Sequence, residues 1–586
     1  MEIHYSKEKN VQVIVSLLKQ YGIRKVVASP GSTNISMVAS LQSDPFFEMY
    51  SSVDERSAAY IACGLAAESG EPVVLTCTAA TASRNYIPGL TEAYYRKLPI
   101  LAITSTTPLA NIGHHQRQSM DRRTIQKDIA NISVLIRNVK DDLDLWDCVI
   151  QANKAMSELT HRGGGPAHIN LETEYCMDFS VKELPEVRKI TRIEPHELIN
   201  KPTMPKGKIG VFIGSCDFMN DRLQQSIECF CESNNAVVFV DHTSHYYGKY
   251  SIHYALLGMQ EFYRSQITNL DLLIHIGNVS GDDYTVGDLT AESVWRVSKD
   301  GEMVDAFKKL EYIFEMDEAV FFDEYSTSSH KKTDFFEICN DEYDFAFKEM
   351  PDLPLSIPCI AKEFHLSLPK DSRVYLGILN SLRSWNMFKI DHSIRLFSNV
   401  GGFGIDGGVS SLVGASLCDK NRIYFGCFGD LQFFYDMNVL GNRHLPSNVR
   451  LIIVNNGRGM EFRNYKHPAS IFGEDGDEFI AAARHYGNMS PTLIKHYAED
   501  LGFDYICVKS KEDLLKAKDS FLNPESSTQP MLMEVFTNKE DEIEALRLVR
   551  DYMVDNKDYA VRKLKDTAKK ILPSDTITSI RKILKK

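Results

Sequence analysis

The sequence lacks the marks of a membrane, secreted or zinc-binding protein. Across its 586 residues there is no run of about 18 apolar residues, so no membrane-spanning helix is expected. The first ten residues are charged and have no apolar core, which predicts no signal peptide. The 12 cysteines form no Cys-x-x-Cys pair, so neither a zinc site nor a disulfide framework is indicated. A reduced, cytoplasmic protein is the expectation.

Acidic residues outnumber basic ones, 79 to 66. The net charge of −13 argues against a nucleic-acid partner. No Gly-x-Gly-x-x-Gly motif occurs in the glycine-containing stretch 207–214, so flavin or dinucleotide binding is not supported. The 43% hydrophobic content is that of a folded protein, and the length is too great for one core.

Apolar strand-like runs alternate with helical spacing along the whole chain, which predicts α/β domains with doubly wound parallel sheets. A charged, proline-containing stretch at 183–205 indicates a linker. The predicted domains are 1–185, 205–355 and 356–555, followed by a basic tail at 556–586. The tail is interpreted as a docked terminal helix, with a membrane-surface or partner-binding helix as the alternative.

The most informative stretch is residues 429–458. A predicted strand at 423–428 runs into Gly429 and Asp430, then a helix-like segment at 431–440, and a strand at 449–454 delivers Asn456. Neighbouring parallel strands would bring Asp430 and Asn456 to one edge of the sheet, where ligands bind. Carboxylate and amide oxygens suit Mg²⁺ held partly through phosphates, and the helix N-terminus favours negative charge.

This Gly-Asp…Asn-Asn pattern resembles the diphosphate motif of thiamine-diphosphate (ThDP) enzymes. Leu431 stands where most of the family has glycine, and is similar to the branch that makes 2-succinyl-5-enolpyruvyl-6-hydroxy-3-cyclohexene-1-carboxylate for menaquinone. The resemblance implies ThDP and Mg²⁺ as cofactors. It places Asp430, Asn456 and the backbone carbonyl of Arg458 on the metal, and Gly429 and Leu431 at the diphosphate.

A second motif, residues 51–78, resembles the pyrimidine-binding segment of the same superfamily. It places Glu55 against N1′ of the aminopyrimidine, where a carboxylate promotes deprotonation of thiazolium C2. The three domains are thus expected to be pyrimidine-binding, central and diphosphate-binding. In the family the two motifs meet across a subunit interface, which implies a homodimer or homotetramer.

Further residues are assigned from the resemblance, each with an ordinary structural alternative. Ile405 matches the apolar wedge under the cofactor, and could be a packed isoleucine. Gln118 matches a glutamine near thiazolium and substrate, and Ser381 a residue near the diphosphate; a loop glutamine and a strand-end cap are the alternatives. His114 and His115 match a pair that can move protons, or are ordinary loop histidines.

The resemblance departs at the substrate. Where the menaquinone branch has arginines for substrate carboxylates, this chain has Thr33, Thr107, Trp385 and Val400, although Arg383 lies nearby. Those residues cannot donate the two parallel hydrogen bonds by which an arginine binds a carboxylate. A substrate less acidic than isochorismate and 2-oxoglutarate is therefore expected.

The leading hypothesis is a ThDP- and Mg²⁺-dependent carboligase or decarboxylase. It would act on a 2-oxo acid donor, with an aldehyde or ketone acceptor in the case of a carboligase, in a specialised pathway such as polysaccharide or sugar modification. The alternatives are a menaquinone-type synthase using isochorismate and 2-oxoglutarate, and a non-catalytic scaffold of the same fold.

Overall fold

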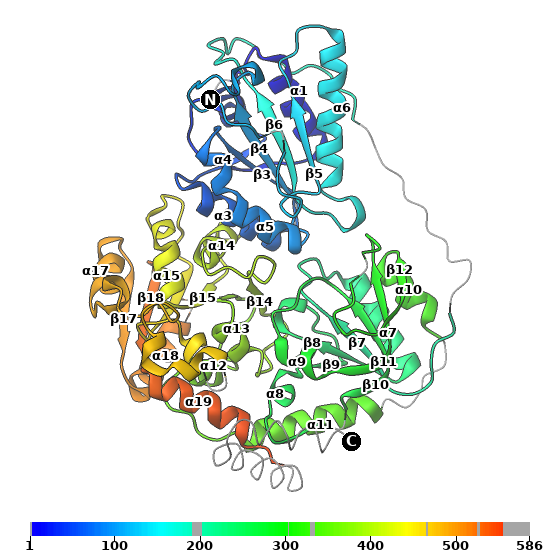
Figure 1. Ribbon diagram of the computed structural model, residues 1–586, viewed down its shortest axis with the longest axis vertical. Helices are drawn as coiled ribbons and strands as arrows, with labels where there is room; N and C mark the ends of the chain where they lie inside the picture. The colour runs from blue at the N-terminus through cyan, green and yellow to red at the C-terminus, as the bar shows by residue number, and fades with distance from the viewer. Residues whose placement is uncertain are drawn as a thin grey trace, which may run out of the picture.

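The computed structural model describes residues 3–122, 124–189, 202–265, 267–302, 304–327, 334–464, 467–523, 525 and 528–554. Within these residues the strands form three six-stranded sheets in which every pair is parallel. Helices cover the sheets (Figure 1). The predicted architecture of three parallel α/β sheets is confirmed. The basic tail and residues 190–201 of the predicted linker lie outside the described residues.

The first sheet has the strand order β2-β1-β3-β4-β6-β5. Its strands are β1 (Lys25–Ala28), β2 (Glu48–Ser51), β3 (Val73–Cys77), β4 (Ile100–Thr106), β5 (Ile132–Ile136) and β6 (Ala167–Glu172). Its helices are α1 (Lys9–Tyr21), α2 (Ile35–Ser43), α3 (Glu55–Ser69), α4 (Thr81–Asn85), α5 (Ile87–Tyr95) and α6 (Asp142–Glu158).

The second sheet has the order β12-β11-β10-β7-β8-β9. Its strands are β7 (Ile209–Ile213), β8 (Ala236–Val240), β9 (Ser251–Ile252), β10 (Asn269–Ile276), β11 (Thr290–Ser298) and β12 (Leu310–Glu315). Its helices are α7 (Asp221–Asn234), α8 (Ala255–Gly258), α9 (Asp283–Asp288), α10 (Glu318–Tyr325) and α11 (Asp334–Glu349).

The third sheet has the order β14-β13-β15-β16-β18-β17. Its strands are β13 (Arg373–Leu376), β14 (Arg395–Ser398), β15 (Tyr424–Gly429), β16 (Val449–Asn455), β17 (Asp504–Val508) and β18 (Met531–Phe536). Its helices are α12 (Ile357–Phe364), α13 (Asn380–Trp385), α14 (Gly408–Ser416), α15 (Asp430–Asp436), α16 (Tyr486–Met489), α17 (Leu493–Asp500), α18 (Lys511–Leu522) and α19 (Lys539–Asp551).

The first and third sheets follow one plan. Subtracting 12 from the third sheet's labels turns its order into 2-1-3-4-6-5, the order of the first. The two units meet through α3 and α14, which face each other in Figure 1. A Cβ added at Gly64 would lie 2.0 Å from the carbonyl oxygen of Ser411, and one at Gly414 only 2.3 Å from that of Ile61. Glycine at both positions is what allows these helices to approach so closely.

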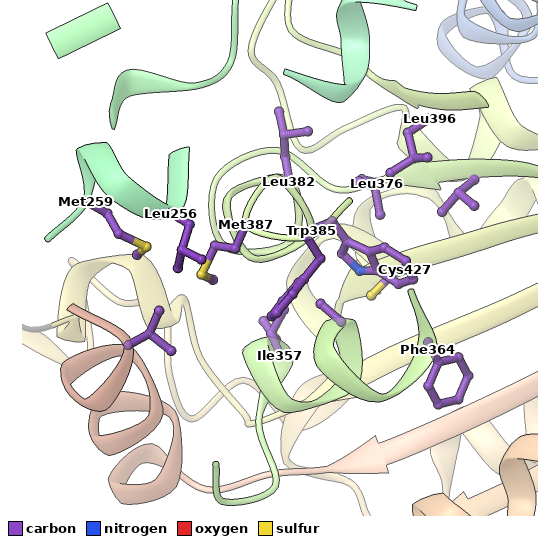
Figure 2. Close-up of a cluster of buried hydrophobic side chains, with 14 of the residues drawn as sticks. Leu256, Met259, Ile357, Phe364, Leu376, Leu382, Trp385, Met387, Leu396 and Cys427 are labelled. Atoms are coloured by element: carbon purple, nitrogen blue, oxygen red, sulfur yellow. The ribbon is translucent and has the colours of Figure 1, made fainter. Parts of the chain in front are cut away.

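The second and third units share an apolar core, part of which is drawn in Figure 2. Leu256 and Met259 come from the second unit, and Met387 and Trp385 from the third. Trp385 is only 1% exposed and is therefore a core side chain. No helix among the described residues has the length and apolar character needed to cross a membrane.

One predicted helix differs in detail from the structure. The helix expected at 431–440 is an α-helix only to Asp436 and then tightens to a 3₁₀ turn at Met437–Gly441, as helix ends often do. In the first unit, α4 begins at Thr81. The Thr78 hydroxyl contacts that of Thr33 at 2.6 Å, which holds residue 78 in the turn before this helix.

Candidate active site

The third sheet ends in a buried carboxylate. Asp430 directly follows β15 and is the first residue of α15. Its side chain is 1% exposed, and Oδ2 accepts a hydrogen bond from the backbone N–H of Gly457 at 3.0 Å. Burial raises the pKa of Asp430 to about 7, against backbone N–H donors that lower it. An adjacent cation would hold this pKa low, and none of the described residues supplies a positive partner for the carboxylate.

The neighbouring strand, β16, leads to two asparagines in different surroundings. Asn455 donates from Nδ2 to Oε1 of Glu534 at 2.7 Å. The Oδ1 atom of Asn456 is buried and has no hydrogen-bond partner among the described residues. Gly457 follows at φ 74°, a left-handed conformation that turns the chain toward Asp430. An unmet acceptor beside a buried carboxylate indicates a cation site that another molecule completes.

The donor set suits a divalent cation shared with phosphate groups. The register of β15 and β16 pairs Gly429 with Val454, so Asp430 and Asn456 follow adjacent strand ends. Within the described ranges no three His, Cys, Asp or Glu side chains form a metal-binding group, so the protein does not close a cage by itself. Mg²⁺ commonly completes its shell with phosphate oxygens and water. A Cβ added at Gly429 would meet no heavy atom within 4 Å, which leaves open space for such a ligand. The residues present therefore fit Mg²⁺ and a diphosphate.

Two polar residues at this edge were not predicted. Gln432 of α15 is 5% exposed, and its amide fills the space that a Cβ on Gly377 or Gly408 would need, at 2.4 and 2.1 Å. These two glycines, one after a strand and one opening a helix, were the available sequence signal. Asn488 of α16 faces Asp430 and lowers its pKa. It lies in an irregular stretch where the sequence gives no periodic signal.

Ser381 lies at the same edge, after β13. It is 3% exposed, and a Cβ on Gly377 would lie 3.5 Å from its Oγ. The preceding Leu379 has φ 62° and ψ −116°, a backbone conformation that costs a non-glycine residue about 1–3 kcal/mol. Leu431 is half-buried beside Asp430. The structure thus brings together five of the predicted cofactor residues: Ser381, Gly429, Asp430, Leu431 and Asn456. The side chain of Arg458, two residues further, donates from Nη1 to Asp477 Oδ2 at 2.7 Å.

Glu55 begins α3 in the first unit and is half-buried. Asn85 donates to its Oε2 at 3.4 Å. The next residue, Arg56, donates from Nη2 to the carbonyl of Tyr435 at 2.7 Å. This contact ties the start of α3 to the C-terminal end of α15, whereas Asp430 lies at the N-terminal end. Among the described residues of one chain, no hydrogen bond joins Glu55 to Asp430.

Comparison with known proteins gives the family. Residues 9–125 match the family model described as thiamine pyrophosphate enzyme, N-terminal TPP binding domain; thiamine pyrophosphate is another name for ThDP. A Bacteroides fragilis protein named 2-succinyl-5-enolpyruvyl-6-hydroxy-3-cyclohexene-1-carboxylate synthase is 30% identical over 573 residues, covering 94% of this chain and 99% of the relative. The chain belongs to the thiamine-diphosphate-dependent enzyme family.

Relatives of the same name from two other bacteria show similar identity and coverage. The Bacteroides thetaiotaomicron protein is 30% identical over 577 residues, covering 94% of this ThDP-dependent enzyme and 99% of the relative. The Phocaeicola vulgatus protein is 31% identical over 576 residues, covering 93% and 98%. The similarity therefore extends over all three units, beyond the matched N-terminal domain.

In this ThDP-dependent enzyme the predicted wedge residue, Ile405, is half-buried in the loop before α14. The next residue, Asp406, accepts a hydrogen bond from the Tyr60 hydroxyl at 3.1 Å and another, on its backbone oxygen, from Arg56. These bonds fix the loop against α3 of the same chain.

The residues predicted to move protons lie in a loop of the first unit. His114, His115 and Gln118 are all exposed in the loop that follows β4, and His115 and Gln118 have left-handed φ values of 54° and 60°. The hydroxyls of Ser119 and Thr107 are 2.9 Å apart and hold the ends of the loop together. The described contacts of one chain do not bring these three side chains to the edge of the third sheet, so their roles stay predictions.

Proposed function

We propose that this enzyme uses ThDP and Mg²⁺ to cleave a 2-oxo acid donor and to join the resulting fragment to an aldehyde or ketone acceptor. The observation that carries the proposal is the buried pair at the third sheet's edge. Among the described residues, Asp430 has no positively charged partner, and the buried Oδ1 of Asn456 beside it has no hydrogen-bond donor. Both needs are met by a cation bound together with a diphosphate.

The proposal gives each predicted residue a task. Asp430, Asn456 and the carbonyl of Arg458 hold Mg²⁺. Ser381, Gly429 and Leu431 adjoin the diphosphate, and Ile405 supports the cofactor's bend. Glu55 holds a proton at the aminopyrimidine, and Gln118 with His114 or His115 moves protons at the substrate. When bound, ThDP supplies the electron sink that lets a bond beside a carbonyl break.

The positions where the menaquinone branch has substrate-binding arginines favour an acid other than isochorismate and 2-oxoglutarate. The candidate replacement, Arg383, donates from Nη1 to Glu461 at 2.7 Å and to Asn380 at 2.9 Å, so its guanidinium is already engaged. Trp385 is a core side chain, and Val400 is fully buried. These positions offer no free guanidinium, which supports a less acidic substrate and a specialised biosynthetic role.

The second candidate is the menaquinone-type synthase, and the printed names of the relatives favour it. It would consume isochorismate and 2-oxoglutarate. Family membership argues against the third hypothesis, the scaffold, because both cofactor motifs are intact.

One experiment separates these candidates. The purified protein, loaded with ThDP and Mg²⁺, is given a panel of 2-oxo acids with and without aldehyde acceptors, and isochorismate with 2-oxoglutarate in a separate arm. We expect CO₂ release and a coupled product from a small 2-oxo acid. Release only in the isochorismate arm would favour the second candidate. Absence of CO₂ in every arm, with cofactor bound, would overturn both.

The proposal also covers the oligomeric state, location and partners of the enzyme. We infer a homo-oligomer, a dimer or a tetramer, because Glu55 and Asp430 do not meet within one chain. We place it in the cytoplasm, since all 12 cysteines are free thiols. Its partners are small molecules, and the charge of −13 disfavours nucleic acid.

A further inference from the structure

A cavity of about 290 Å³ lies in the first unit, between α4–α5 and residues 121–122 and 124–129. One part of its wall is polar, with Arg122, Arg84 and Ser83, and the other part is apolar, with Ile87, Leu90 and Ile125. The cavity lies against the face of the first sheet, where Thr104 toward the end of β4 and His168 at the start of β6 line it. Its volume is at the small end for ligand pockets, which suits a small molecule.

Arg122 is the unusual member of the wall. It is 7% exposed, and its Nη2 donates to the carbonyl of Ser105 at 3.1 Å and to Oδ1 of Asn170 at 2.8 Å. Its Nε and Nη1 atoms are buried, and neither has a hydrogen-bond partner in the part of the chain that the structure describes. Burying two guanidinium N–H donors without acceptors costs free energy. A ligand that enters the cavity and accepts hydrogen bonds from them would remove this cost.

Among the described residues, no ion pair joins Arg122 to a carboxylate. Burial lowers the pKa of Arg122 to about 10, which leaves the side chain cationic at neutral pH. Arg84, another cation, lowers it further. Burial and Arg122 lower the pKa of His168 to about 3, so that ring is neutral. Asp121 lines the cavity as well, but its side chain is exposed to solvent. An anion is the group that this environment lacks.

The position of the cavity connects it with the proposed chemistry. Asn85, beside the lining residue Arg84, donates to Glu55 at 3.4 Å. The Cys77 thiol is within electrostatic reach of both Arg122 and Glu55. Gln118, predicted to face the substrate, lies four residues before Arg122 on the same segment.

We propose that the Arg122 cavity binds the carboxylate of the donor substrate, a small 2-oxo acid with a short apolar side chain. The two free N–H groups of Arg122 match a carboxylate, and the isoleucine and leucine side chains match a short alkyl group. The description of the bound acid as a substrate rests on the proposed function. Binding of the acid to the cavity can be measured without turnover.

The test uses full-length protein with ThDP and Mg²⁺, and the probes are pyruvate, 2-oxobutyrate and inorganic phosphate. Binding is followed by the rise in melting temperature with probe concentration. We expect saturable binding of a 2-oxo acid by the native protein, a loss of about tenfold or more in affinity for Arg122→Gln, and a smaller loss for Arg122→Lys. Arg162→Gln is the matched control, because Arg162 is an exposed guanidinium paired with Glu315 at 3.2 Å. It should bind like the native protein.

The outcomes are separable. Unchanged ThDP binding by Arg122→Gln shows that the variant is folded. Equal affinity of that variant for the 2-oxo acids, binding of phosphate alone, or no binding of any probe by the native protein each overturns the inference. Where the native protein turns over the acid, Arg122→Gln should raise KM about tenfold with a smaller change in kcat. Arg122-dependent binding without any CO₂ release would leave the cavity assignment standing and would reject the proposed function instead.

Discussion

The first and third sheets have the same strand order, but the units around them bury opposite charges. In the third unit the buried group is the Asp430 carboxylate, whose pKa burial raises to about 7. In the first unit it is the Arg122 guanidinium, whose pKa burial lowers to about 10. Among the described residues neither group pairs with an opposite charge, so each lacks the opposite kind of ligand.

The difference shows how one topology yields two binding chemistries. Parallel strands bring their carboxyl ends together whatever the residues are, and the residues then decide what binds. After β15 and β16 stand Asp430 and Asn456, a set for a cation. After β3 stands Thr78, whose hydroxyl contacts that of Thr33, and the buried charge of this unit comes instead from Arg122, which bonds to residues of β4 and β6.

Removing the third sheet's charge should have the largest effect. For Asp430→Asn we expect ThDP affinity in Mg²⁺ to fall by about 100-fold or more, with turnover lost, because a neutral amide cannot hold the cation as a carboxylate does. Calorimetry with ThDP and Mg²⁺ measures this. Asp436→Asn is the control, since Asp436 is a buried acid at the other end of the same helix. Equal losses in both variants would refute the assignment.

The first unit's acid should matter for turnover and not for cofactor binding. For Glu55→Gln we expect kcat to fall about 100- to 10,000-fold, because a proton carrier is removed, with ThDP affinity nearly unchanged. Asp54→Asn is the control: Asp54 caps α3 by accepting from the N–H groups of Arg56 and Ser57, and asparagine caps equally well. Full activity of Glu55→Gln would contradict the role.

The two asparagines after β16 sharpen the comparison within one sheet edge. Asn455→Ala should cost about 1–3 kcal/mol of unfolding free energy, because it removes the donor to Oε1 of buried Glu534 and leaves that carboxylate only the Tyr505 hydroxyl on Oε2. Asn456→Ala should cost little stability without cofactor, but should raise the Mg²⁺ concentration required for activity by about tenfold. Urea unfolding and Mg²⁺ titration distinguish them; swapped effects would show that the wrong asparagine has been assigned.

Much of this site could be predicted from sequence because its pieces are local. The spacing of Asp430 and Asn456 follows from strand, helix and strand, and Glu55 is assigned by the resemblance of residues 51–78 to a pyrimidine-binding segment. Non-local features could not be predicted. Gln432 is recognised only because two glycines from other segments make room for it. Arg122 is marked only by the hydrogen bonds that Ser105 and Asn170 provide from separate strands.

The raised pKa of Asp430 predicts a pH dependence. Protons compete with the cation, so Mg²⁺-dependent ThDP binding should weaken by up to about tenfold per pH unit below pH 7. In the protein without cofactor, the free energy of unfolding changes with pH in the opposite direction. The unfolded chain releases this proton near its ordinary value of 3.8, so the Asp430 contribution to stability falls as pH rises to about 7 and then levels off. Both effects should vanish in Asp430→Asn; an unchanged profile would contradict the cause.

The smallest predicted effect compares one backbone conformation in the two units. Ala80 has φ 63° and ψ −129°, close to the values of Leu379. Ala80→Gly should stabilise the protein by about 1 kcal/mol, because glycine adopts this conformation without strain. Leu379→Gly should gain less, since a half-buried leucine side chain is lost. Thermal unfolding measures both, and destabilisation by Ala80→Gly would exclude strain at this turn.

Mixing two inactive variants tests most directly whether the edges of the first and third sheets form one site across two chains. A hybrid of Glu55→Gln and Asp430→Asn subunits contains one site with both acids intact if each site takes Glu55 from one chain and Asp430 from its partner. Co-expression should then restore about a quarter of native activity, because half of randomly paired dimers are hybrids with one good site of two. Activity no higher than that of either variant alone, with hybrids demonstrably formed, would contradict the account.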